Sequence, residues 1–241
     1  MMQVRIFDDA GLLAVEGAKL TAQALTQDPQ MAITVATGRS PIALYEQLAK
    51  LRRRGQVDTD TVKVFQLDTY LGIPEDDPRS LWRWMEEAFL RPLDIGNDRA
   101  GKFDAMTQDV TAECRRYDGA IAASGGLGLA VLGLGPNGHV AFNEPPSGAD
   151  APTRAVTLTA DSLNSNAGYW DGLDVPKQGL TLGMAPLLAA RKVIFVVTGA
   201  HKHAILRKTI EGPVTPDVPA SLFQDHPDAL VLADRAAWDG P

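Results

Sequence analysis

The chain has 241 residues, and 45% of them are hydrophobic, which is enough for one sizeable core. Its net charge of −7 favours solubility and argues against nucleic acid as a partner, so an anionic ligand would need local binding groups. The apolar runs, such as 193–197, are too short to cross a membrane, and the N-terminal stretch has no signal-peptide core, so we expect a cytoplasmic protein.

Short apolar, β-branched runs alternate along the chain with amphipathic segments, which is typical of βαβ units. The expected strands cover 3–7, 32–36, 62–67, 127–132, 155–159, 179–182, 192–197 and 229–232. The expected helices cover 9–26, 41–54, 80–90, 108–123 and 201–210, followed by a turn at 221–226. We therefore predict one Rossmann-like α/β domain over residues 1–241, with a largely parallel sheet flanked by helices. Residues 144–178 are rich in Pro, Gly, Ser and Asn and predict a lid or small subdomain.

The first chemical segment follows the strand at 32–36. Here Thr37, Gly38, Arg39 and Ser40 precede Pro41, which predicts a helix with Ser40 at the N-cap and the proline at its first position. Free amides at such a helix end favour a phosphate, and the glycine allows close backbone approach. The alternative is an ordinary capped turn.

The next strand, 62–67, runs directly into Asp68. A carboxylate at the carboxyl end of a strand can act as a general base. The alternative is that Asp68 only caps or hydrogen-bonds the following turn, as aspartates at strand ends commonly do.

The segment GLGPNGHVAFNEP, residues 133–145, follows another strand. Its glycines match the G-x-G-x-x-G pattern of dinucleotide-binding sites. However, two prolines block the helix that such a site requires, and no acidic residue ends a second strand about twenty positions on, so we exclude NAD binding. The segment predicts instead a flexible turn, with Gly135 and Gly138, that presents His139. Glu144 is close enough in sequence to orient or polarise this histidine.

A second strand-to-helix turn, Thr198 to Lys202, repeats the arrangement of the first. A lysine in the first turn of a helix opposes the helix dipole, so Lys202 favours a bound anion there; the alternative is a solvent-facing lysine. No metal site is predicted, because the four histidines are poorly spaced for one and the single cysteine, Cys114, cannot form a thiolate cluster.

Together these segments resemble the glucosamine-6-phosphate deaminase (isomerase) family, whose superfamily includes 6-phosphogluconolactonase. The resemblance spans nearly the whole chain and is carried by FQLDTYLGIP, GLGPNGHVAFNEP, VPKQGLTLG, TGAHK and PASLFQDHP. The NEP ending favours the deaminase branch, because the lactonase pattern has a different Ser- and Phe-containing stretch after the histidine.

The resemblance implies that Asp68 moves a proton between C2 and C1 of an open-chain sugar, and that His139 opens the sugar ring with help from Glu144 and Asn137. The implied reaction converts a 2-amino-2-deoxy-hexose 6-phosphate and water to a ketose 6-phosphate and ammonia, without a cofactor. The predicted substrate- and phosphate-binding residues are Thr37, Gly38, Arg39, Ser40, Gly135, Gly138 and Lys202.

The chain departs from the family pattern at two places: Thr69 stands where Glu is common, and Gly168 stands where the best-known deaminases have a phosphate-binding arginine in the lid. Asn137 occupies a position where members have Asp or Asn, so the resemblance does not imply a full Asp–His–Glu relay. We hypothesise that Arg39 supplies the missing positive charge. The sugar therefore stays open between glucosamine 6-phosphate and an epimer such as galactosamine 6-phosphate.

Two other functions stay open: 6-phosphogluconolactonase, and a sugar-phosphate sensing domain without catalysis. The presence of Asp68, His139 and Glu144 and the lack of an attached helix-turn-helix segment disfavour the sensing domain. Arg154 falls near a region linked to effectors in oligomeric relatives, although a lone arginine is more often a surface charge. The chain ends soon after Asp234, so we expect a monomer or small homo-oligomer.

Overall fold

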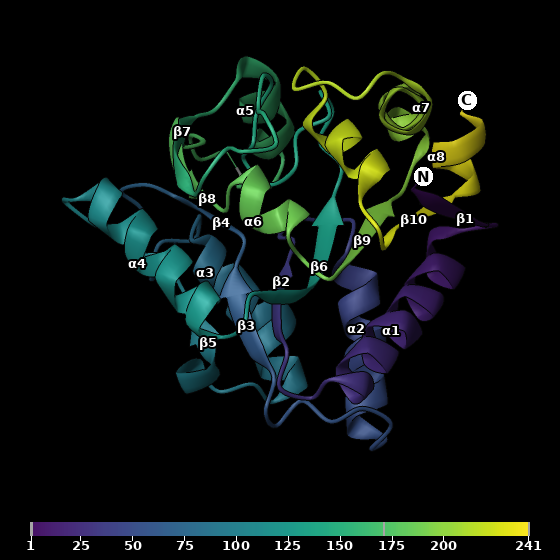
Figure 1. Cartoon of the computed structure of the whole chain (residues 1–241), viewed down its shortest axis with the longest axis horizontal. Helices are drawn as coiled ribbons and strands as arrows, with labels where there is room; N and C mark the ends of the chain where they lie inside the picture. Colours follow the sequence, from purple (N-terminus) through teal and green to yellow (C-terminus); the bar gives the residue numbers. More distant parts are fainter. Residues whose placement is uncertain (1, 171, 241) are drawn as a thin grey trace.

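The computed structural model describes residues 2–170 and 172–240, and its centre is a seven-stranded parallel sheet (Figure 1). The strands lie in the order β1-β10-β9-β6-β2-β3-β5. Their bounds are β1 Gln3–Phe7, β2 Ala32–Val35, β3 Lys63–Gln66, β5 Ala100–Gly101, β6 Leu127–Gly133, β9 Lys192–Val197 and β10 Ala229–Asp234. From β2 the chain builds outward to β3 and β5, and from β6 it builds the other way to β9 and β10. The strand order therefore reverses between the neighbours β2 and β6.

Helices cover both faces of this sheet. The α-helices are α1 Ala10–Gln27, α2 Ile42–Arg53, α3 Leu81–Met85, α4 Val110–Ala123, α5 Ala160–Ala167, α6 Met184–Leu188, α7 His203–Glu211 and α8 Arg235–Asp239. A π-helical segment, Glu86–Leu90, continues α3, and 3-10 turns lie at Arg91–Leu93, Asn97–Arg99, Ala200–Lys202 and Pro219–Asp225. Aspartates define where the long helices begin: the carboxylates of Asp9 and Asp109 accept hydrogen bonds from the backbone N–H groups three residues on.

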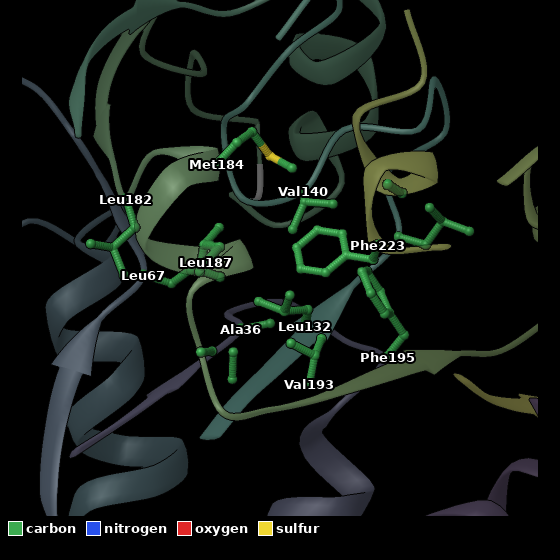
Figure 2. Close-up of a cluster of buried hydrophobic side chains, with 14 of the residues drawn as sticks. Ala36, Leu67, Leu132, Val140, Leu182, Met184, Leu187, Val193, Phe195 and Phe223 are labelled. Carbon is green, nitrogen blue, oxygen red and sulfur yellow. The ribbon is translucent and has the colours of Figure 1, made fainter. Parts of the chain in front are cut away.

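The strands are apolar on both sides, because each side packs under a different set of helices. In β9, Phe195 belongs to a core shared with α4, α6 and α7, whereas its neighbour Ile194 belongs to a core shared with α1 and α2. The first core also contains Val140, the residue after His139, together with Met184 and Phe223 (Figure 2). Burial of Val140 therefore anchors the turn that carries the histidine.

A small antiparallel sheet lies beyond the carboxyl ends of the large one. It has the order β4-β8-β7, with bounds β4 Asp68–Tyr70, β8 Gln178–Thr181 and β7 Arg154–Thr157. In Figure 1 the arrow of β6 points toward this unit, which also carries α5. Its own core contains Tyr70, Phe142 and Trp170. The segment from β7 to β8, with α5, is called the lid below.

All eight predicted strands and the predicted helices are present, with ends that shift by up to two residues, and helix 80–90 is part α and part π. The sequence analysis did not predict β4, β5, α5, α6 or α8, because each is short or polar. One local prediction was wrong: α2 begins at Ile42 with Pro41 as its N-cap, and the Ser40 side chain makes no capping bond.

Candidate active site

A cavity of about 310 Å³ lies at the carboxyl ends of β2 and β6, where the strand order reverses. Ligands of open α/β sheets bind at this position. The cavity is lined by residues that follow β2, β6 and β9, by β4, and by the lid. Ten of the eleven predicted site residues lie in its wall or directly behind it, and Gly138 is the exception.

Asp68 lies at the bottom of the cavity as the first residue of β4. It is buried, and its Oδ1 accepts a hydrogen bond from Thr37 Oγ1 at 3.4 Å. Burial raises the pKa of Asp68 to about 7, because desolvation disfavours the charged form more than the threonine bond favours it. A carboxyl group with this pKa can both accept and return a proton near neutral pH.

His139 reaches the same cavity from the turn after β6, with Glu144 behind it. The ring Nδ1 lies 3.4 Å from Glu144 Oε2, and Asn137 Nδ2 donates to the same oxygen at 2.9 Å. Asn137 Oδ1 in turn accepts from the backbone N–H of His139 at 3.1 Å. Burial raises the pKa of Glu144, but hydrogen bonding and charge from His139 outweigh it and lower this pKa to about 2. Glu144 is therefore a carboxylate that faces the histidine and not the cavity.

The two glycines of this turn have different surroundings. A Cβ added at Gly135 would overlap the imidazole ring of His139, so the ring packs directly against the glycine backbone. Gly138 lies outside the cavity wall, has a positive φ of 88°, and is packed against Val218 and Ile205. Gly135 therefore sets the position of the ring, whereas Gly138 allows the turn to fold.

Another part of the cavity wall consists of the turn Thr37 to Ser40 and Lys202. Gly38 has a φ of 109°, a conformation that L side chains rarely adopt. Burial lowers the pKa of Lys202, and none of the carboxylates that the structure describes forms an ion pair with it. The turn before Lys202 is fixed by Asp234, whose two carboxylate oxygens accept from Gly199 N at 3.0 and 3.1 Å.

Arg39 bridges this wall and the lid. Its guanidinium donates to the carbonyl of Gly168, at the carboxyl end of α5, at 2.5 Å and lies 5.2 Å from the centre of the Tyr169 ring. Arg39 thus occupies the space beside Gly168, the position at which the best-known deaminases are expected to have a lid arginine.

Arg154 is not a simple surface charge, contrary to the more common outcome for a lone arginine. Its guanidinium is half-buried and donates to Asn143 Oδ1 at 2.7 Å and Ser147 Oγ at 2.9 Å. These two residues flank Glu144 in the chain, so Arg154 braces the turn that carries it.

Sequence reasoning missed the lid residues at the site. Ser162 and Thr159 contact the histidine–glutamate pair, and Asn166 Nδ2 donates to Tyr70 OH at 3.1 Å in the cavity wall. One signal was available: Thr159 is followed by Ala and Asp, a pattern typical of a helix N-terminus. Its position against Glu144 required the tertiary structure.

The described ranges, 2–170 and 172–240, contain neither a helix suited to span a bilayer nor a group of His, Cys, Asp and Glu side chains suited to hold a metal ion.

The fold and the cavity together define a Rossmann-like α/β protein with a buried aspartate and a histidine–glutamate pair at the switch point of its sheet. Residues 10–232 match the family described as glucosamine-6-phosphate isomerases/6-phosphogluconolactonase. The chain therefore belongs to this enzyme family.

Individual relatives agree with the family match. A protein named glucosamine-6-phosphate deaminase from Halothermothrix orenii is 36% identical, and the match covers 98% of this chain and 98% of the relative. Another from Streptomyces coelicolor is 40% identical, and the match covers 98% of this chain and 91% of the relative. A solved structure of a monomeric glucosamine-6-phosphate deaminase superposes with a TM-score of 0.93 at 32% identity and 98% coverage of each chain. A 6-phosphogluconolactonase from Thermotoga maritima shares the fold, with a TM-score of 0.76 at 20% identity. That match covers 97% of this chain and 99% of the other.

Proposed function

We propose that this protein is a glucosamine-6-phosphate deaminase that converts glucosamine 6-phosphate and water to a ketose 6-phosphate and ammonia. The observation that carries the proposal is the placement of Asp68, with its pKa near 7, in the same cavity as the Glu144-backed His139. The relatives named as deaminases cover nearly the whole chain and support this activity over lactone hydrolysis.

In the proposed reaction, His139 transfers the proton that opens the sugar ring, and Glu144 stabilises the imidazolium that forms. Asp68 then removes the proton from C2 of the open-chain aldehyde and delivers it to C1. One proton of the amino group passes to the C1 oxygen, so the transfer leaves an imine at C2 and a hydroxyl group at C1. Water then adds to C2, and ammonia leaves to give the ketose. The proton transfers at the sugar use His139 and Asp68 of this cavity, and no step calls for a cofactor.

The phosphate is proposed to bind between the turn Thr37 to Ser40 and Lys202. Lys202, a partly buried cation, lines the same cavity as this turn, whose backbone N–H groups precede α2. Arg39 is within reach of the same ligand, and its present partner is only a carbonyl, which a phosphate can replace as a stronger acceptor.

The activity is tested by incubating the purified chain with glucosamine 6-phosphate, galactosamine 6-phosphate and 6-phosphogluconolactone, with ammonia and acid release as readouts. We expect ammonia from glucosamine 6-phosphate and little from the epimer. Acid release from the lactone without ammonia from either sugar would overturn the proposal, as would tight binding of hexose phosphates with no turnover, which a sensing domain predicts.

The role of Arg39 is tested separately by Arg39→Ala, for which we expect a higher KM for the sugar phosphate. Arg53→Ala is the matched control, because this exposed arginine at the end of α2 removes the same charge away from the cavity. An unchanged KM in Arg39→Ala would remove this residue from the phosphate site.

We also propose a cytoplasmic monomer that binds a small molecule and not nucleic acid. The net charge of −7 disfavours nucleic acid as a partner, and the similar monomeric deaminase structure supports the monomer. Sedimentation of the purified protein would test the monomer, since a dimer would have twice the mass of 25.8 kDa.

A further inference from the structure

Ser162, in the first turn of α5, contacts the ring nitrogen of His139 that faces away from the cavity. The distance from Ser162 Oγ to His139 Nδ1 is 3.1 Å, shorter than the 3.4 Å from this nitrogen to Glu144 Oε2. Ser162 is only 1% exposed, so water does not compete for the contact. The nearest polar partner of the histidine therefore comes from the lid.

The start of the same helix also holds Glu144. The backbone N–H of Thr159 donates to Glu144 Oε1 at 3.3 Å, and the Thr159 hydroxyl donates to Oε2 at 3.2 Å. The Asn137 amide also donates to Oε2, at 2.9 Å. The carboxylate is thus held by three donors, two of which belong to Thr159.

These contacts define the direction of the hydrogen bonds. A carboxylate only accepts hydrogen bonds, so Glu144 Oε2, at 3.4 Å from Nδ1, favours a proton on this nitrogen. The Ser162 oxygen, at 3.1 Å, then accepts from the same N–H. His139 Nδ1 then carries the proton. The other ring nitrogen, Nε2, keeps its lone pair, and the ring lines the cavity against Gly135.

We propose that Ser162 is a positioning residue that holds His139 in the tautomer with the proton on Nδ1 and that makes this alignment depend on the lid. The inference rests on the proposed function, in which His139 accepts and returns a proton at the sugar. Because Ser162 and Thr159 both belong to the lid, a displacement of α5 removes the partner of Nδ1 and two donors to Glu144 together. His139 is then fully aligned only when the lid covers the cavity.

The tautomer is measured directly by ¹⁵N NMR of the substrate-free protein at about pH 8, where an ordinary imidazole is neutral. The His139 signals are those that disappear in His139→Gln. We expect Nδ1 to give a protonated-type shift and Nε2 an unprotonated-type shift, and Ser162→Ala to move both toward a mixture of tautomers. A wild-type spectrum with the proton on Nε2 would overturn the inference.

Kinetics provide the second readout. We expect Ser162→Ala to lower kcat by roughly 10- to 100-fold, the loss typical of an outer hydrogen-bond partner of a metal-bound histidine, with little change in KM. Ser162→Thr retains the hydroxyl and should recover much of kcat. Asn164→Ala, an exposed substitution in the same helix, controls for changes in helix stability. An unchanged kcat and tautomer in folded Ser162→Ala would refute the positioning role.

The NMR measurement needs no substrate, so the two proposals can fail separately. A wild-type protein without deaminase activity but with the expected tautomer contradicts the proposed function and leaves the positioning role of Ser162 supported. An active wild-type protein whose Ser162→Ala variant keeps its kcat and tautomer contradicts only the positioning role.

Discussion

Replacing Asp68 by asparagine should abolish activity and stabilise the protein at the same time. Asparagine has nearly the same shape, so Thr37 keeps a side-chain oxygen to which it can donate. Loss of the proposed base should lower the rate of ammonia release by roughly 10²- to 10⁴-fold. The stability gain follows from burial, because the folded protein holds a carboxylate without its hydration shell above neutral pH.

The size and pH range of this gain follow from the pKa of Asp68. This pKa is 3.8 for the free group and about 7 in the folded protein, so the folded state binds the proton more tightly. The group therefore does not oppose folding below about pH 4, and its ionisation costs progressively more stability as the pH rises toward 7. Above pH 7 the full cost is about 4 kcal/mol, at roughly 1.4 kcal/mol for each tenfold change in the proton affinity.

Urea unfolding of wild type and Asp68→Asn at about pH 5 and about pH 8 measures this difference. We expect the variant to gain stability relative to wild type between the two pH values. Asp150→Asn, in an exposed loop, is the matched control and should show no such gain. Equal stability differences for Asp68→Asn at both pH values would refute a raised pKa, and retained ammonia release would refute its role as the base.

Three further substitutions test the rest of the site. Gly135→Ala should lower kcat by about 100-fold without unfolding the protein, because its methyl group displaces the His139 ring; a normal kcat would show that the ring is placed elsewhere. Lys202→Met should raise KM for the sugar phosphate while melting at an equal or higher temperature, since it removes a partly desolvated charge. An unchanged KM, measured by initial rates, would contradict phosphate binding there. Glu144→Gln should lower kcat and destabilise the protein above about pH 4.5. This stability difference should shrink as the pH falls toward 2, where the wild-type carboxylate takes up its proton. A difference in urea unfolding that is independent of pH would argue against the lowered pKa.

The sequence alone predicts most of the sheet, because strands that are buried on both faces appear in the sequence as short, continuous apolar runs. It also predicts which strand ends carry chemistry, since Asp68 and the turn with His139 directly follow apolar runs. The capping of α2 was wrong by one position, because the turn before Pro41 forms part of the cavity wall instead of capping the helix.

The tertiary structure alone decides how these groups behave. The pKa of Asp68 depends on desolvation by segments distant in the sequence, so the residues next to it in the chain do not predict the shift. Arg39 meets the carbonyl of Gly168 across 129 positions, and Ser162 meets His139 across 23. Short segments of the sequence therefore identify the residues that do the chemistry. Their protonation states and orientations depend on burial and on contacts that form only when the lid and the sheet are folded.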